Sequence, residues 1–258
     1  MCYDASYLTK RALDYARLRG HDPQNIADLE IQWEQIKKNL GPKFHTSGFE
    51  HPYLVGYKHE PAMQVHTFYW GLIPFWVKDG KSAQQMAHRT LNARGETIFE
   101  KPAFRSSAKN HRAVVVVDQF FEHHHHKGKT YPFLIKRKDE APMHLAALWS
   151  EWVNKETGEV LQSASIVTTD GNQLLSKIHN NPKMKGPRMP VILEPETTET
   201  WLNPELAKKQ VLELMQPYED RALDAYPVGR LRGKNRVGNQ KEVLEKVNYP
   251  ELAESMNL

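Results

Sequence analysis

The feature that most constrains the fold is a series of short β-prone segments between two helical stretches. From His45 onward, runs enriched in Val, Ile, Tyr and Thr recur between turn-forming residues. These runs span residues 53–57, 63–70, 112–117, 131–136, 144–149 and 160–168. Residues 154–158 (NKETG) are typical of a hairpin turn. Many short strands joined by turns favour a curled, mostly antiparallel sheet.

The two flanking stretches show apolar residues at helical spacing. The first covers residues 5–40 and ends at Gly41-Pro42, and the second begins at about residue 197, with Pro204 in a first turn. No internal repeat or low-complexity linker divides the chain. We therefore expect one α+β domain over residues 1–258, with a barrel-like sheet core and peripheral helices.

Charge and cysteine content exclude several classes of protein. The 258 residues carry a formal charge of +4, which permits a nucleic-acid partner but lacks the dense basic face of a polyelectrolyte binder. A single cysteine excludes an internal disulfide. Even the longest apolar runs, such as residues 113–117, are far shorter than the roughly 20 residues of a membrane-spanning helix. With Asp4 near the start and no apolar leader, we expect a cytoplasmic protein without a membrane partner.

The single cysteine is Cys2, and two interpretations of it stay open. An inert terminal thiol is the common case. Alternatively, removal of Met1 would place a free amine beside the thiol on one residue. An aldehyde condenses with such an amine to an imine, and addition of the thiol then closes a five-membered thiazolidine. The closure is intramolecular and benefits from a high effective molarity.

Two further side chains suit proton transfer. Glu122 ends an apolar stretch that contains Phe120 and Phe121, and a carboxyl enclosed by phenylalanines can act as a general acid or base. The alternative is a strand-end glutamate that faces water. His179 follows the apolar Ile178, where it is either a helix C-terminal histidine or a proton shuttle.

Polar and aromatic motifs elsewhere suggest contacts with DNA. In residues 92–97 (NARGET), Arg94 could bind a phosphate and Asn92 could hydrogen-bond to an opened sugar. The alternative interpretation of this polar segment is a solvated loop. Trp70 and Trp76 flank a turn at Pro74 and form either aromatic core or a base-stacking platform.

The four consecutive histidines, 123–126, do not predict a metal site. In an extended chain they alternate between faces, and no other Cys or His pair has zinc-site spacing. We expect an exposed hairpin there, and we expect neither a metal nor another cofactor.

Taken in order along the chain, these pieces resemble one family. They are Cys2 and residues 70–74 (WGLIP), 92–97 (NARGET), 100–105 (EKPAFR), 117–122 (VDQFFE), 178–179 (IH) and 188–193 (RMPVIL). The chain is similar to the SRAP family, the SOS-response-associated peptidases now understood as abasic-site processing proteins. The resemblance runs from residue 2 to beyond Trp201 and implies the SRAP fold.

The resemblance implies a covalent trap for abasic sites in single-stranded DNA. Cys2 would form the thiazolidine, Glu122 would act as acid and base, and His179 would assist opening of the sugar ring. Asn92 and Arg94 would hold the sugar and flanking phosphates. The family also implies strand cleavage at abasic sites and removal of its own leading methionine.

Four further residues are expected to contact DNA, from their side-chain chemistry and from the family resemblance. They are Trp70, Pro74, Trp76 and Arg188. We expect a monomer, and the sequence identifies no replication partner. Two alternatives stay open: a cysteine-dependent peptidase or hydrolase in which His179 is the base, and a non-covalent reader of damaged DNA.

Three departures from the family pattern bear on this hypothesis. The family continues its cysteine with Gly-Arg, whereas this chain has Tyr3-Asp4. His123 stands where the family has tryptophan after the glutamate. Residues 180–187 are inserted before Arg188, and Lys183 and Lys185 in that insert are candidates for the missing basic contact.

Overall fold

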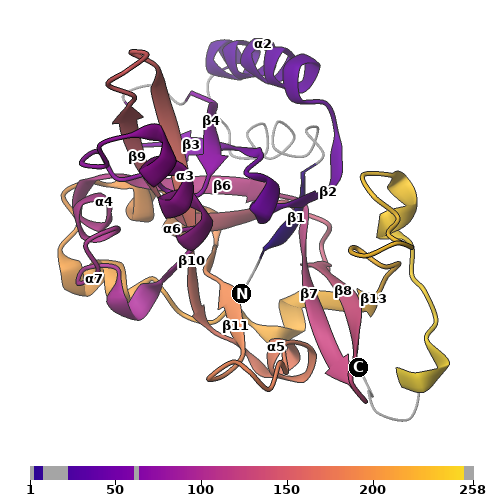
Figure 1. Cartoon of the computed structure of the whole chain (residues 1–258). Helices are drawn as coiled ribbons and strands as arrows, with labels where there is room; N and C mark the ends of the chain where they lie inside the picture. Colours follow the sequence, from indigo (N-terminus) through magenta and orange to yellow (C-terminus); the bar gives the residue numbers. More distant parts are fainter. Residues whose placement is uncertain (1–2, 8–22, 61–63, 253–258) are drawn as a thin grey trace.

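Five strands close into a barrel in the centre of the molecule (Figure 1). The computed structural model describes residues 3–7, 23–60 and 64–252. The barrel strands, in order, are β10 (Val160–Asp170), β4 (His66–Trp70), β3 (Tyr53–Lys58), β6 (Arg112–Val117) and β9 (Met143–Val153). β9 pairs with β10 to close the ring, and every pair is antiparallel except β10 with β4. The predicted curled, barrel-like core of a single α+β domain is confirmed.

Strand β6 is buried on both faces, which explains its uninterrupted apolar run. Val115 belongs to the larger core cluster with its cross-strand partner Leu145. The next side chain, Val114, belongs to a second cluster with Trp201 of helix α6 (Pro195–Leu202). The Trp201 Nε1–H donates to the Ala113 carbonyl over 2.8 Å and fastens that helix to the barrel.

A second antiparallel sheet lies beside the barrel. Its order is β13 (Leu223–Pro227), β8 (Lys129–Arg137), β7 (Gln119–His126), β1 (Asp4–Tyr7) and β2 (Lys43–Ser47). The chain passes from barrel strand β6 to β7 at Asp118, whose N–H donates to the Ser6 carbonyl over 2.9 Å. Figure 1 shows β7, β8 and β13 side by side, with the yellow C-terminal segment along their outer side.

Shorter elements cover the barrel and its ends. The remaining strands are β5 (Asn92–Arg94) and β11 (Arg188–Pro190), which pair with β10, and β12 (Ile192–Leu193), which pairs with β9. The helices are α2 (Pro23–Leu40), α3 (Gly80–Arg89), α4 (Arg105–Asn110), α5 (Gln173–Ile178), α6 and α7 (Lys208–Glu213). Single 3-10 turns lie at Gly48–Glu50, Gly95–Thr97, Asp220–Ala222, Lys241–Leu244 and Pro250–Leu252. In the part of the chain that the structure describes, no helix combines the length and apolar character needed to cross a membrane.

The helix predicted from residue 5 is wrong at its start, because Asp4–Tyr7 forms strand β1 between β7 and β2. Pairing along both edges satisfies the backbone of this short segment, and Ala5 is fully buried. Helix α2 confirms the later part of the predicted stretch. Residues 8–22 lie outside the described residues.

The predicted C-terminal helical stretch is two short helices and a strand. Pro204 lies between α6 and α7 instead of inside a first turn. Asn203, the residue before it, has an extended backbone (φ −62°, ψ 112°), as steric contact with the proline ring requires. Strand β13 then follows, so the region beyond residue 197 is only partly helical.

The four histidines form one arm of a hairpin, as expected, but they are half-buried or buried instead of exposed. Residues 123–126 belong to β7 and pair with β8, and His124 is only 6% exposed. The turn is the next two residues, Lys127 (φ 45°) and Gly128 (φ 74°). Positive φ at both positions is the geometry of a tight two-residue hairpin loop.

Candidate active site

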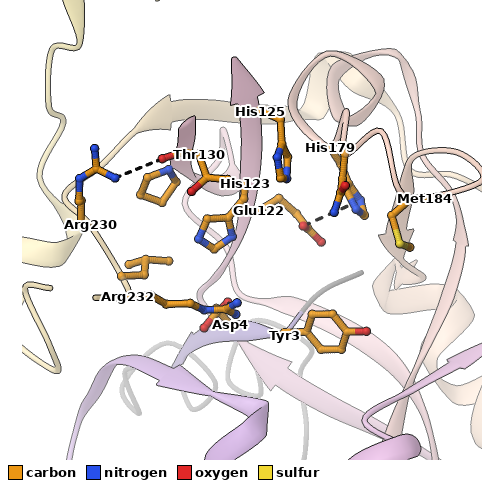
Figure 2. Close-up of a pocket in the computed structure, with 13 residues that line it drawn as sticks. Tyr3, Asp4, Glu122, His123, His125, Thr130, His179, Met184, Arg230 and Arg232 are labelled. Carbon is orange, nitrogen blue, oxygen red and sulfur yellow. Dashed lines mark hydrogen bonds and ion pairs between the residues drawn. The ribbon is translucent and has the colours of Figure 1, made fainter. Parts of the chain in front are cut away.

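A cavity of about 290 Å³ lies between the second sheet, the segment after α5 and the C-terminal segment. Figure 2 shows Glu122 and His179 on one side of it and Tyr3, Asp4 and Arg232 on another. These side chains come from β7, the end of α5, the start of the chain and the segment after β13. The cavity therefore gathers ionisable groups from distant parts of the sequence.

The structure brings the two predicted proton-transfer residues together. The Glu122 Oε2 and His179 Nδ1 atoms are 3.9 Å apart, within ion-pair range if the histidine is protonated. Both side chains are almost fully buried, at 5% and 6% exposure. Each reaches the cavity, so they form a nearly dry pair that can exchange protons with a molecule bound there.

Side-chain amide contacts fix the end of α5 against β7. The Asn180 carbonyl Oδ1 accepts from the His125 backbone N–H over 2.7 Å, and Asn180 Nδ2 donates to the His125 carbonyl over 2.9 Å. The His124 ring nitrogen Nδ1 lies 3.0 Å from the Lys177 carbonyl. Asn180 thus pairs with β7 as a neighbouring strand would, and His179 is held beside Glu122.

The His179 ring is oriented by strand β11. Its Nδ1 lies 3.2 Å from the Arg188 backbone N and 3.1 Å from the Arg188 carbonyl oxygen. Either tautomer finds a partner: unprotonated Nδ1 accepts from the N–H, and protonated Nδ1 donates to the carbonyl. The segment of residues 180–187 therefore brings Arg188 back into contact with His179.

The Arg188 guanidinium is buried among protein groups. It donates to both oxygens of Glu96 over 2.6 and 2.7 Å, to Asp170 over 2.7 Å and to the Thr168 carbonyl over 2.7 Å. Its side chain is 7% exposed. This network connects β10, β11 and the Gly95–Thr97 turn. It therefore links the motif of residues 92–97 to the Arg188 backbone groups that contact the His179 ring.

The two residues of the 92–97 motif differ in environment. Both amide atoms of the Asn92 side chain are buried, and neither makes a hydrogen bond within the described part of the chain. Arg94 is exposed two positions further along β5, as a phosphate contact requires. Neither is among the described residues that line the cavity around Glu122 and His179. The amide of Asn92 is therefore a donor and acceptor in need of a partner.

The tryptophan motif divides into core and surface. Trp70 is fully buried and its Nε1–H donates to the Leu91 carbonyl over 2.9 Å, so no base can stack on it. Pro74 is buried at the turn, where its carbonyl accepts from the Val77 N–H over 3.0 Å. Trp76 is 46% exposed, and the neighbouring Phe75, which the sequence motifs did not single out, is 65% exposed. Within this motif, Trp76 and Phe75 are therefore the rings on which a base could stack.

An ionic cluster at the cavity wall was not predicted from the sequence. The Asp4 carboxylate accepts from Arg232 Nη2 over 2.7 Å and lies 3.0 Å from His45 Nε2. Burial alone would raise the pKa of Asp4, but the hydrogen bond with His45 and the charge of Arg232 lower it overall. A charged residue inside a four-residue strand was a signal of such a partner. The position of that partner, far along the chain, had no local signal.

His123, which follows Glu122 in β7, is neutral. Burial lowers the pKa of His123 to about 4, with Arg232, His125 and His45 adding to the effect and Asp4 opposing it. His123 therefore borders the cavity as an uncharged ring at neutral pH. Lys183 and Lys185, in the inserted segment, are both exposed.

Cys2 lies outside the described residues, and its neighbour Tyr3 lines the cavity. Among the residues that the structure describes, no group of three or more His, Cys, Asp or Glu side chains is arranged to hold a metal ion. The described wall of the cavity carries two carboxyls, three imidazoles and two guanidinium groups.

Comparison with known proteins gives consistent matches. The family model for the SOS response associated peptidase (SRAP) matches residues 14–235. Abasic site processing protein YoqW of Bacillus subtilis (strain 168) is 37% identical over 188 residues, covering 72% of this chain and 74% of that protein. Abasic site processing protein HMCES of Xenopus tropicalis is 28% identical, covering 65% of this chain and 53% of that protein.

Solved structures agree with the fold. A crystal structure of a protein from Bacteroides thetaiotaomicron superposes with a TM-score of 0.79 at 32% identity, covering 95% of this chain and all of that one. The matched family region includes the barrel, every strand of the second sheet except β1, and Glu122 and His179. The chain thus belongs to the SRAP family.

Proposed function

We propose that this protein captures abasic sites in single-stranded DNA through a covalent bond to Cys2. One observation carries the proposal: the buried Glu122–His179 pair faces a cavity that Tyr3 also lines. Consecutive Cα atoms are about 3.8 Å apart, so chain connectivity supports action of Cys2 at this cavity. The relatives named abasic site processing proteins support the same substrate.

In the proposed reaction, the Cys2 amine attacks the aldehyde carbon of the ring-opened sugar. A proton passes from the nitrogen to the oxygen, and Glu122 then donates a proton to the resulting hydroxyl, which leaves as water. The Glu122 carboxylate takes back the remaining proton from the nitrogen, which yields an imine. The Cys2 sulfur then bonds to the imine carbon, and the thiol proton passes to the nitrogen. The overall reaction joins one aminothiol and one aldehyde into a thiazolidine and releases one water. Glu122 would catalyse the reverse reaction by the same steps.

His179 would assist the step before capture. Opening of the closed sugar moves a proton from its anomeric hydroxyl to the ring oxygen, and an imidazole is suited to that transfer at neutral pH. The contacts of His179 with Arg188 fix its ring for this task. We accordingly propose Arg188 as a positioning residue, because its guanidinium is occupied by Glu96 and Asp170.

Other residues would hold the DNA. We propose that exposed Arg94 contacts a phosphate, that the buried amide of Asn92 binds the sugar or its linkage, and that Trp76 with Phe75 stacks on bases. Strand cleavage through the imine and removal of the leading methionine are further activities proposed for the same site. We propose that the protein acts on DNA in the cytoplasm as a monomer.

Intact mass spectrometry after incubation with uracil-excised single-stranded DNA tests the proposal. Wild-type protein is expected to gain the mass of the oligonucleotide less one water, and Cys2→Ala protein is expected to form no stable adduct. Cys2→Ser should give only an imine that borohydride traps, because a hydroxyl is a poorer nucleophile than a thiol. A wild-type protein that binds without a mass increase would favour a non-covalent reader, and cleavage of peptides without an adduct would favour a peptidase.

A further inference from the structure

The segment after β13 carries a strongly cationic loop, residues 229–238, which we call the basic loop. It contains Arg230, Arg232, Lys234 and Arg236 and no acidic residue. Arg230 and Arg232 line the cavity of Glu122 and His179, and Arg232 and Arg236 line an adjoining hollow on the other side of Asp4. The basic loop thus forms a continuous cationic border between the two concave surfaces.

The loop is anchored to the second sheet. Leu231 is 4% exposed and packs in a cluster with Phe121 of β7 and Leu134 of β8. The Val237 N–H donates to the Arg230 carbonyl over 2.9 Å and closes the loop on itself. Because the buried Leu231 lies between the exposed Arg230 and Arg232, it fixes the backbone from which both arginines extend.

Arg232 is oriented by Asp4 and keeps most of its donors. Asp4 accepts one hydrogen bond from Nη2 over 2.7 Å, whereas a guanidinium has five N–H donors. The Arg232 side chain remains 52% exposed. A buried carboxylate that aims a half-exposed guanidinium leaves donors for an outer anion, and the planar guanidinium matches phosphate geometry.

Aromatic rings lie directly beside this cation. The Arg232 guanidinium carbon is 5.6 Å from the Phe49 ring centroid, and the Tyr3 and Phe49 rings are 4.9 Å apart. Phe49 is 48% exposed. Cations interleaved with exposed aromatic rings suit a single strand, whose phosphates and unstacked bases alternate.

Other charges in the area do not cancel this pattern. Arg230 and Arg236 are exposed or half-exposed, and within the described residues neither takes part in an ion pair with an acidic side chain. Arg230 makes one long hydrogen bond, 3.5 Å, to the Thr130 carbonyl, visible in Figure 2. The acidic groups of the adjoining hollow are Asp4, already paired, and Glu50.

We propose that the basic loop and Phe49 form a phosphate-binding and base-stacking surface for single-stranded DNA next to the cavity. This inference deepens the proposed function and rests on it for the identity of the strand. Arg230, Arg232 and Arg236 bind successive phosphates, and Asp4 is a positioning residue for Arg232. The surface guides an intact stretch of the strand, while the damaged nucleotide enters the cavity.

Fluorescence anisotropy with a labelled, undamaged single-stranded oligonucleotide tests this surface without any aldehyde chemistry. The slope of log binding constant against log salt should become shallower by about 0.7 for each phosphate that a variant no longer binds. Arg232→Gln should therefore lower the slope by about 0.7, Arg230→Gln with Arg236→Gln by about 1.4, and Arg232→Lys should preserve it. Lys155→Gln, an exposed cation in the distant turn between β9 and β10, is the matched control and should bind as wild type does.

Melting temperatures distinguish a DNA-binding role of these arginines from a purely structural role of Arg232. A slope unchanged in the Arg230/Arg236 double variant, with Arg232→Gln lowering only the melting temperature, would overturn the inference. So would a wild-type protein without salt-dependent binding. A wild-type protein that shows the predicted slopes but forms no adduct with abasic DNA would instead overturn the proposed function and leave the strand-binding surface standing.

Discussion

Strands β6 and β7 follow each other in the chain with one residue between them, yet they bury different chemistry. From Ala113 to Val117, β6 buries only apolar side chains, on both faces of the barrel wall. In the second sheet, β7 buries Gln119, Glu122 and His124 around its two phenylalanines. Buried polar groups cost stability unless they are satisfied. Gln119 donates to the Ser6 hydroxyl and His124 contacts the Lys177 carbonyl, whereas Glu122 lines the cavity and is the candidate for function.

The difference assigns separate tasks to the two sheets. The barrel closes on itself and supplies a packed apolar core on both sides of β6. The second sheet places Glu122 at the cavity, and His179 lies against Glu122. We expect mutations in the barrel to change stability and mutations in the second sheet to change chemistry.

The largest effect is expected from truncation of a barrel side chain. Leu145 in β9 is fully buried opposite Val115, so Leu145→Ala should lower the free energy of unfolding by roughly 2 to 5 kcal/mol. Denaturant titration measures this decrease. Val153→Ala at the 46% exposed end of the same strand is the control and should cost far less. A large drop in crosslinking rate per folded molecule of the Leu145 variant would break the proposed division of tasks.

Glu122→Gln should show the opposite pattern. Loss of one positioned acid and base should slow formation or reversal of the crosslink by roughly 10²-fold. The unfolding free energy should stay near that of wild type, because the amide keeps the shape of the carboxyl and leaves no cavity. Rapid-quench gels with an abasic oligonucleotide give both rates, and Glu151→Gln on an exposed part of β9 serves as the comparison. Wild-type rates in both directions would remove Glu122 from the site.

The pH dependence of stability should sharpen the comparison by a smaller amount. His123 of β7 has its pKa lowered to about 4, so between pH 6.5 and 4 the unfolded chain binds more protons there than the folded one. Stability must therefore fall as pH decreases through this window, and the lowered pKa of Asp4 acts in the same direction at lower pH.

Replacement of His123 by Gln should reduce the decrease in stability between pH 6.5 and 4.5 by about 1 to 2 kcal/mol. Chemical denaturation at a series of pH values measures it, with His59→Gln at an exposed position as the control. An identical pH profile in the His123 variant would show that its burial does not govern acid sensitivity of the second sheet.

The same contrast explains which features could be predicted from the sequence. Strand β6 and the turn at 154–158 were predicted because their patterns are local: an apolar run, and a cluster of turn residues. Strand β1 was missed because four mixed residues become a strand only when β2 and β7 flank them. The hairpin at the β7 histidines was predicted, but the burial of these side chains was not, because it depends on α5 and β8.

Within the site, the local sequence identified the individual proton-transfer residues, but it did not identify contacts between residues far apart in the chain. The apolar setting of Glu122 and the end of a helical pattern at His179 were visible in the sequence. The pairing of Asp4 with Arg232 joins residues 228 positions apart, so no local pattern could indicate it. The burial of Trp70 was likewise decided by packing from other strands, which its motif does not contain.

The central claim is that Cys2 acts through the amine and the thiol of one residue. A preceding residue converts that amine into an amide, which cannot condense with an aldehyde. The most direct measurement compares three samples on abasic single-stranded DNA by denaturing gel: N-terminally tagged protein, the same protein cleaved to expose Cys2, and a C-terminally tagged form with Met1 removed. We predict heat-stable crosslinks in the second and third samples and none in the first. Equal crosslinking by the uncleaved N-tagged protein would contradict the claim, because an internal group would then be the nucleophile.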